Sequence, residues 1–199
     1  MPTPFIAPEA ITEVDLTIRS YQPGDGPALC AGKRASYEHL RPWMPWARPD
    51  DSDDECEAQV RHFCGKYLQG IDFVLSIWLA GPEGPQFAGG TGFHLRGQDL
   101  AVGVADIGMW IVAPLAGQGL GTRSLRLMLR WGFTEWAWQR LTWHCDSRNL
   151  ASARTAEKAG MRLEGTMRRN FLDVHGERRD TCIYAMLKDD WPVQPADAG

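Results

Sequence analysis

Three glycines alternate over five positions where an apolar run meets a helical pattern. The stretch WIVAPLAGQGLGTRSLRLM places them at Gly117, Gly119 and Gly121. The start of a helix offers unpaired backbone N–H groups and a partial positive charge, and glycine lets an anion approach the backbone closely. The pattern predicts either a phosphate-binding turn, most simply for a pyrophosphate, or a tight strand-to-helix turn that needs glycine for its backbone alone.

The residues beside these glycines argue against two common phosphate-binding loops. A nucleotide-hydrolysing P-loop ends in Gly-Lys-Ser/Thr, whereas Gly121 is followed directly by Thr122. The dinucleotide fingerprint GxGxxG opens its domain, whereas the spacing here is GxGxG in the middle of the chain. NTP hydrolysis and NAD binding are therefore disfavoured.

The elements that must hold this turn follow strand and helix patterns in mixed order. Strands are expected at 14–21, 72–80, 87–95, 104–112, 140–146, 161–169 and 178–187, and helices at 28–40, 55–70, after the glycines and at 149–159. Ser52 and Glu55 stand at capping-box spacing before the second helix. We expect a single α/β domain over residues 1–199, with a core at about 14–188, flexible tails such as 191–199, and helices on both faces of one mixed sheet of about seven strands.

Composition excludes several classes of protein. The chain has 199 residues, 44% of them hydrophobic, and a net charge of -4, which gives no sign of nucleic-acid binding. No signal peptide or membrane-spanning stretch is evident, so neither a membrane nor a nucleic acid is an expected partner. Cysteines occur without any CxxC pair, which favours reduced thiols and a cytoplasmic location, at positions 30, 56, 64, 145 and 182.

Longer motifs give these features a family. AGQGLG at 116–121 is similar to the acetyl-CoA signature [QR]xxGx[GA], with Ala116 in place of the first Gln or Arg. Together with ADIGMWIVAPLAGQGLGT, LRPWMPWA, CDSRNLASARTAEKAGMRLEG and VHGERRDTCIYAML, it resembles the ribosomal-protein N-acetyltransferase (RimJ/RimL-like) branch of the GNAT superfamily over about residues 14–188. The resemblance implies a mostly antiparallel sheet whose fourth and fifth strands splay apart to hold the pantetheine of acetyl-CoA.

The resemblance also implies which groups contact the co-substrate. The pantetheine is expected along the backbone of Trp110, Ile111 and Val112, and at the side chain of Asn149, which is also a common type of helix N-cap. The pyrophosphate is expected on the turn, at Gly117, Gln118, Gly119, Leu120, Gly121 and Thr122. No metal is expected.

Three side chains are candidates for proton transfer. Asp106 stands where many family members carry a glutamate that takes a proton through water, and His144 is its rival, because an imidazole titrates near neutral pH. The family pattern ranks Asp106 first. Ser152 is expected to donate a proton to the CoA sulfur, since the tyrosine that many members use is absent from AEKAGM. The alternatives are a solvated carboxylate, a structural histidine and a first-turn helix serine.

A proline-rich loop is expected to cover the acceptor. Trp43 and Trp46, with Arg41 and Arg48, are candidates for a substrate lid. The acids that follow, at 50, 51, 53 and 54, either attract a cationic amine or simply begin a helix.

The expected function is transfer of an acetyl group from acetyl-CoA to a primary amine, first of all a protein N-terminal amine as in the ribosomal-protein enzymes. The alternatives are a small-molecule amine or antibiotic as acceptor, a non-catalytic acyl-CoA-binding sensor on the same fold, and a nucleotide-binding regulatory domain. The resemblance also suggests a homodimer.

Overall fold

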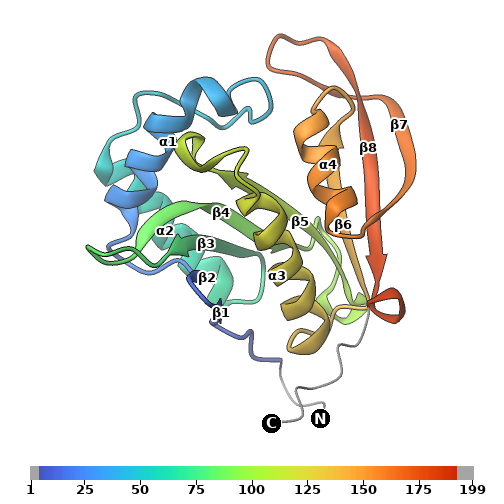
Figure 1. The fold of residues 1–199 in the computed structure, drawn as a ribbon, viewed down its shortest axis with the longest axis horizontal. Helices are drawn as coiled ribbons and strands as arrows, with labels where there is room; N and C mark the ends of the chain where they lie inside the picture. The colour runs from blue at the N-terminus through green and yellow to red at the C-terminus, as the bar shows by residue number, and fades with distance from the viewer. Residues whose placement is uncertain (1–4, 192–199) are drawn as a thin grey trace.

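One sheet of eight strands runs through the protein in the order β1-β2-β3-β4-β5-β6-β8-β7 (Figure 1). The computed structural model describes residues 5–191. Its strands are β1 (Ala10–Glu13), β2 (Leu16–Ser20), β3 (Phe73–Leu79), β4 (Gln86–His94), β5 (Val104–Ile111), β6 (Arg140–Asp146), β7 (Arg162–Leu172) and β8 (Arg178–Leu187). Its α-helices are α1 (Gly26–Leu40), α2 (Asp53–Leu68), α3 (Leu120–Thr134) and α4 (Leu150–Lys158). All neighbouring strands are antiparallel except β5 and β6, so the expected α/β fold class is confirmed.

Helices cover both faces of the sheet. α3 and α4 lie on one face and α1 and α2 on the other, and each face has its own hydrophobic cluster. The larger cluster joins β5 residues Ala105 and Ile107 to the buried face of α3, which includes Leu125 and Met128. The smaller cluster lies on the other face, where α1 and α2 pack against β4 and β5. Because side chains alternate along a strand, the even-numbered residues of β5 face α1 and α2, and the odd-numbered ones face α3 and α4.

The ends of the helices follow the chemistry of the sequence. The capping box of α2 is present, because Glu55 N donates to Ser52 Oγ at 3.2 Å and Ser52 N donates to Glu55 Oε2 at 2.7 Å. Pro27 stands in the first turn of α1, where a missing N–H costs nothing. These local signals explain why the helix positions were predictable to within a few residues.

The N-terminal hairpin differs from the expectation of one strand at 14–21. Val14 has φ 57° and Asp15 follows it in a two-residue turn, since Glu13 already pairs with Leu16. The expected strand therefore begins only at Leu16, as β2, and the unexpected strand β1 lies before the turn and raises the total from about seven to eight. Residues 192–199 of the expected tail lie outside the described residues.

The sheet opens between β5 and β6. The two strands pair at only three positions, ending with Asp106 opposite Thr142. Beyond this point β5 stays paired with β4 as far as Ile111, and β6 stays paired with β8 as far as Asp146. The sheet therefore splits into two halves, as expected for a pantetheine-binding splay. Over residues 5–191, no helix is both long and apolar enough to cross a membrane.

Candidate functional site

The glycine turn forms an open cradle of backbone donors. Gly117 and Gly119 have φ values of 76° and 86°, which residues with a Cβ rarely adopt. The first intrahelical bond runs from Arg123 N to Gly119 O at 3.0 Å, and among the described residues no acceptor is present for the six N–H groups of 117–122. Gln118 Nε2 donates to Pro114 O at 2.8 Å and so stabilises the turn. Successive free N–H groups at a helix start suit a phosphate.

Three elements surround the opening beside this cradle. A Cβ built on Gly121 would lie 3.8 Å from the side chains of both Ile111 and Thr155, so the start of α3, the end of β5 and the first turns of α4 meet there. Asn149 lies at the N-terminus of α4, where its Oδ1 accepts from Ser152 N at 3.1 Å. Asn149 is therefore an N-cap, and its side-chain NH₂ is left to serve a ligand.

The strand backbone that faces the splay differs from the expected set. Val112 N donates to Ala88 O at 2.9 Å and Val112 O accepts from Leu115 N at 2.9 Å, so both groups are already used. Because backbone direction alternates along a strand, Trp110 also faces β4, whereas Met109 and Ile111 face the splay. The strand geometry thus favours Ile111 of the expected set together with Met109 as the groups that face the splay, whereas Val112 already has backbone partners.

Ser152 lies beside the splay on the α4 face of β6. Its Oγ accepts from Trp143 Nε1 at 3.0 Å, which leaves the hydroxyl proton free to be donated. Its hydrogen bond to Cys145 lowers the pKa of that thiol, but burial dominates and raises it to about 11. The single hydroxyl proton can point to only one sulfur at a time, so donation to a CoA sulfur would replace the contact with Cys145.

Asp106 and His144, the two candidate bases, lie together where the splay begins. His144 Nδ1 is 3.4 Å from Asp106 Oδ1, and Thr142 Oγ1 donates to the same oxygen at 3.1 Å. Arg96 donates to Asp106 Oδ2 from Nε at 3.0 Å and from Nη2 at 2.7 Å. The Asp106 side chain is only 5% exposed and that of His144 is 37% exposed, so the histidine is the member of the pair that a substrate can reach.

Arg96 could not be predicted as a site residue, because it lies in the loop between β4 and β5 and belongs to no recognisable motif. Its backbone φ of 51° is unusual for a residue other than glycine, and this conformation turns the chain directly after β4. Backbone angles are not visible in a sequence, so no signal there could have linked Arg96 to Asp106.

The proline-rich loop lies over the other end of β5. Trp46 contacts Trp110 edge-on, with ring centroids 5.8 Å apart. Two of the four acids that follow the loop form ion pairs within the protein. Asp51 pairs with the buried Lys33, and Asp53 lies 3.4 Å from Arg34. These contacts favour the helix-start interpretation of the acids over attraction of an amine.

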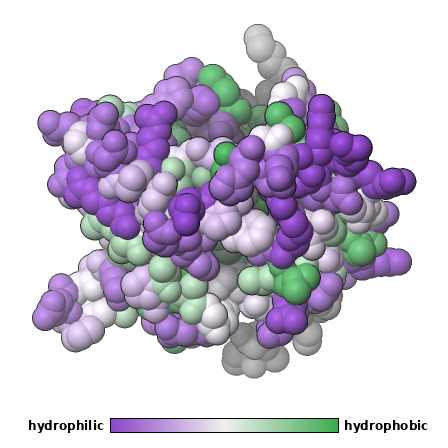
Figure 2. All heavy atoms as spheres, turned by 90° about the horizontal axis from the view of Figure 1, so that it is seen from above, coloured by the Kyte–Doolittle hydropathy of each residue, from purple (hydrophilic) through white to green (hydrophobic). Residues whose placement is uncertain are grey.

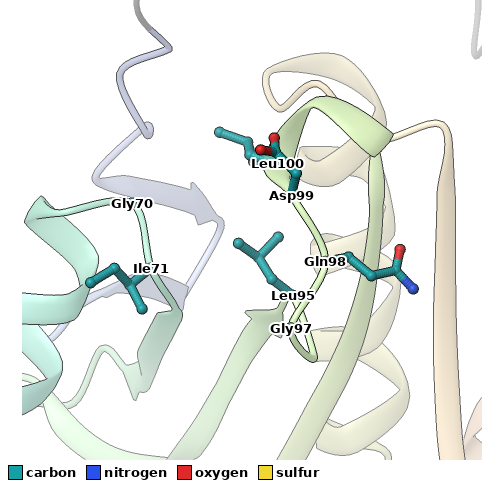
Figure 3. A pocket seen from close by; sticks show the side chains of 7 residues that line it. All are labelled: Gly70, Ile71, Leu95, Gly97, Gln98, Asp99 and Leu100. Atoms are coloured by element: carbon teal, nitrogen blue, oxygen red, sulfur yellow. The ribbon is translucent and has the colours of Figure 1, made fainter.

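Two hollows lie away from the glycine cradle, along the loop between β4 and β5. The larger, about 450 Å³, lies between the turn after α2 and that loop, and in Figure 3 Ile71 faces Leu95 and Leu100 across it. The smaller, about 230 Å³, shares Ile71 and Leu95 with it and also includes Asp72 and His94. Viewed from above, the molecule is mainly hydrophilic with scattered hydrophobic residues (Figure 2).

Comparisons with known proteins agree with this geometry. The family model described as an acetyltransferase (GNAT) domain matches residues 15–162. YdaF of Bacillus subtilis (strain 168), provisionally named a ribosomal N-acetyltransferase, is 27% identical over 88% of this chain and 93% of its own.

Solved structures share the fold. The RimL ribosomal L7/L12 alpha-N-protein acetyltransferase in complex with coenzyme A has a TM-score of 0.80 at 23% identity and covers 92% of this chain and 100% of its own. The microcin C7 self-immunity acetyltransferase MccE, in complex with acetyl-CoA and AMP, has a TM-score of 0.79 at 20% identity and covers 92% and 98%. The chain therefore belongs to the GNAT family and is an acetyl-CoA-dependent N-acetyltransferase.

Proposed function

We propose that this enzyme acetylates a protein N-terminal amine, with direct attack of the amine on the thioester of acetyl-CoA. The ribosomal N-acetyltransferase name of the relative that spans most of the chain supports this acceptor. The observation that carries the mechanism is the splay, because the phosphate cradle and Ser152 lie on its α3 and α4 side, whereas Asp106 and His144 lie on its α1 and α2 side.

The two substrates approach from opposite faces of the sheet. The pyrophosphate of acetyl-CoA sits on the amides of 117–122, and its pantetheine passes between β5 and β6 along the free backbone groups of Met109 and Ile111. The side-chain NH₂ of Asn149 contacts the same arm. The thioester then reaches the beginning of the splay, where the amine meets it from the α1 and α2 side, so proximity supplies a large part of the rate.

His144 is the proton acceptor and Asp106 orients it. Both oxygens of Asp106 are engaged by Arg96 and Thr142, and the side chain is buried, so the carboxylate cannot reach an amine directly. Its Oδ1 lies 3.4 Å from His144 Nδ1, close enough to stabilise by charge the imidazolium that forms when Nε2 takes a proton. This assignment reverses the order that the family pattern favours.

Ser152 serves the leaving group. As the C–S bond breaks, its hydroxyl donates a hydrogen bond to the sulfur, and the thiolate gains the proton that the amine nitrogen has lost. Trp143 fixes the hydroxyl oxygen from behind. The net reaction converts an ammonium and a thioester into an amide, a thiol and one proton released to solvent.

A screen of acceptors tests the proposal. The protein is incubated with acetyl-CoA and with peptides that carry the N-termini of ribosomal proteins, and in parallel with small amines and amine-containing antibiotics; products are identified by mass spectrometry. Acetylated peptide α-amines support the proposal. Turnover with small amines alone would favour the second acceptor class, for which the fold-level likeness to MccE is the supporting observation. Tight CoA binding without any turnover would indicate an acyl-CoA sensor.

A cytoplasmic location and a homodimer belong to the same proposal. All five cysteines are free, in keeping with a reducing compartment. The edge strand β7 exposes apolar side chains, among them Leu163 and Phe171, that a second copy could cover. Analytical ultracentrifugation of the protein and of Phe171→Asp measures whether this edge supports association.

A further inference from the structure

A second imidazole–carboxylate pair lies on the acceptor face, one strand away from the first. His94 is the last residue of β4 and stands directly opposite Asp106 in the ladder between β4 and β5. Its Nδ1 lies 2.8 Å from Asp72 Oδ1, in the turn between α2 and β3. When Nδ1 carries its proton toward the carboxylate, Nε2 holds the free lone pair, which is the arrangement of a general base.

Glycines in two strands let this ring lie flat on the sheet. A Cβ added at Gly108 would come within 2.9 Å of His94 Nε2, and one added at Gly92 would come within 3.1 Å of the same atom. Gly108 is the first β5 residue on this face beyond Asp106, the last position paired with β6. The free nitrogen of His94 therefore faces the beginning of the splay.

On its other side His94 borders a hollow that leads away from the sheet. The hollow of about 230 Å³ is lined by Asp72 and His94 together with Lys66 and Arg96. The His94 side chain is 19% exposed. The His94 ring thus lies between the beginning of the splay and a hollow that water can enter.

The carboxylate that holds His94 is ionised. Burial alone would raise the pKa of Asp72, but the hydrogen bond and charge of His94, with Lys66 and Arg96, outweigh it and lower the pKa, so this carboxylate stays ionised.

Acyl transfer to an ammonium group requires two protons to leave the same nitrogen. The first must leave before attack, to free the lone pair, and the second leaves after the C–N bond has formed. We propose that His94, held at Nδ1 by Asp72, takes the first proton at Nε2 and gives it up from the same nitrogen, once the acceptor has left, to a water that enters from the adjoining hollow. The N–H electrons stay on nitrogen as the pair that attacks the thioester carbonyl. The second proton goes to His144 and from there serves the departing thiolate. This inference rests on the proposed function.

His94→Gln and Gly108→Ala test the assignment by independent routes. The glutamine cannot act as a base, and the alanine methyl displaces the ring while meeting no other atom within 3.2 Å. We expect each variant to lower kcat/KM for a peptide α-amine at pH 7 by up to about tenfold, because with a pKa near 8 only about a tenth of the amine is already neutral. The loss should shrink about tenfold per pH unit up to the pKa of the acceptor amine, because a neutral amine needs no base. The dissociation constant for acetyl-CoA should stay unchanged.

The double variant and two controls complete the design. If Gly108→Ala acts by moving the ring, His94→Gln/Gly108→Ala should be no slower than His94→Gln alone. Asp72→Asn should give a smaller loss with the same pH rescue, and His62→Gln, on the exposed side of α2, should match the unmodified enzyme. A pH profile of His94→Gln that runs parallel to the unmodified one, or additive losses in the double variant, overturns the inference while acetyl transfer itself stands. Absence of turnover by the unmodified protein with every acceptor overturns the proposed function and this inference together.

Discussion

Two glycines of the turn can separate co-substrate binding from folding, because alanine should affect stability at them with opposite signs. Gly119 has φ 86° and a Cβ there would meet no atom within 4 Å, so the cost of Gly119→Ala is that of the left-handed backbone alone. Gly121 lies inside α3 with ordinary helical geometry, and a Cβ there would make only ordinary contacts at 3.8 Å. In the proposed binding mode, both methyl groups would enter the space that acetyl-CoA takes.

The magnitudes follow from these geometries. A residue with a Cβ in the left-handed region costs about 1–2 kcal/mol, whereas alanine gains up to about 1 kcal/mol over glycine within a helix. For a protein of this size, 1 kcal/mol shifts Tm by roughly 2–4 °C. Gly119→Ala should therefore lower Tm by about 2–8 °C and Gly121→Ala should raise it by up to about 4 °C. Loss of one charge-assisted hydrogen bond to the pyrophosphate, worth about 1.5–3 kcal/mol, weakens CoA binding roughly 10- to 100-fold in either variant.

Thermal melts without ligand and isothermal titration with CoA measure the two quantities separately. The decisive variant is Gly121→Ala, since any loss of affinity in a protein that melts at a higher temperature cannot come from unfolding. A Gly121→Ala protein that is more stable and binds CoA with unchanged Kd would refute the placement of the co-substrate between α3, α4 and β5.

Three further predictions concern other parts of the site. Ser152→Ala should lower kcat about 10- to 100-fold in steady-state kinetics while the Kd for acetyl-CoA changes less than about twofold, and equal losses in both would make Ser152 a binding residue only. Arg96→Gln should reduce the free energy of unfolding in urea by about 1–3 kcal/mol, because the buried Asp106 loses its charged donor; an unchanged midpoint would mean that solvent replaces the arginine. Burial would raise the pKa of Asp146, but hydrogen bonds from Arg148 and its charge outweigh burial and lower it, so the ion pair stabilises the fold above about pH 4 and is lost as pH falls through the folded pKa. Arg148→Gln should accordingly lower Tm more at pH 7 than at pH 3, and equal shifts at both pH values would contradict this.

Local chemistry explains which parts of the fold the sequence could predict. The capping box at Ser52 and Glu55, the apolar face of α3 and the alternation in β6 are each decided within about 15 residues, and the structure has them where they were expected. The extra strand β1 and the start of β2 at Leu16 depend on pairing between these two strands and on the left-handed turn at Val14, which the sequence pattern does not show. Tertiary context decided that element, not propensity.

The site residues show the same difference between features decided locally and features decided by tertiary contacts. The glycine turn is a property of one short segment, so its spacing predicted a strand-to-helix turn that needs glycine at Gly117 and Gly119, whereas its binding of a pyrophosphate stays a prediction. Asp106 and His144 were found as rivals, because a sequence gives each residue a type but not a partner; only the register of β5 against β6 shows that they form one pair. Arg96, His94 and Asp72 come from three separate segments that meet at the end of β4, and none stands in a motif.

The splay explains why the proton-handling groups lie where they do. Where β5 and β6 separate, the backbone groups of Met109 and Ile111 lose their ladder partners on β6. In the proposed mechanism a pantetheine amide would supply new partners, and the thioester would then reach the last paired position, Asp106. At that position the even-numbered side chains of β5 face away from the co-substrate, toward α1 and α2, and only there can a base act on the amine without competing with acetyl-CoA for space. The alternation of side chains along one strand thus separates donor from acceptor, and the two imidazoles on the acceptor side follow from it.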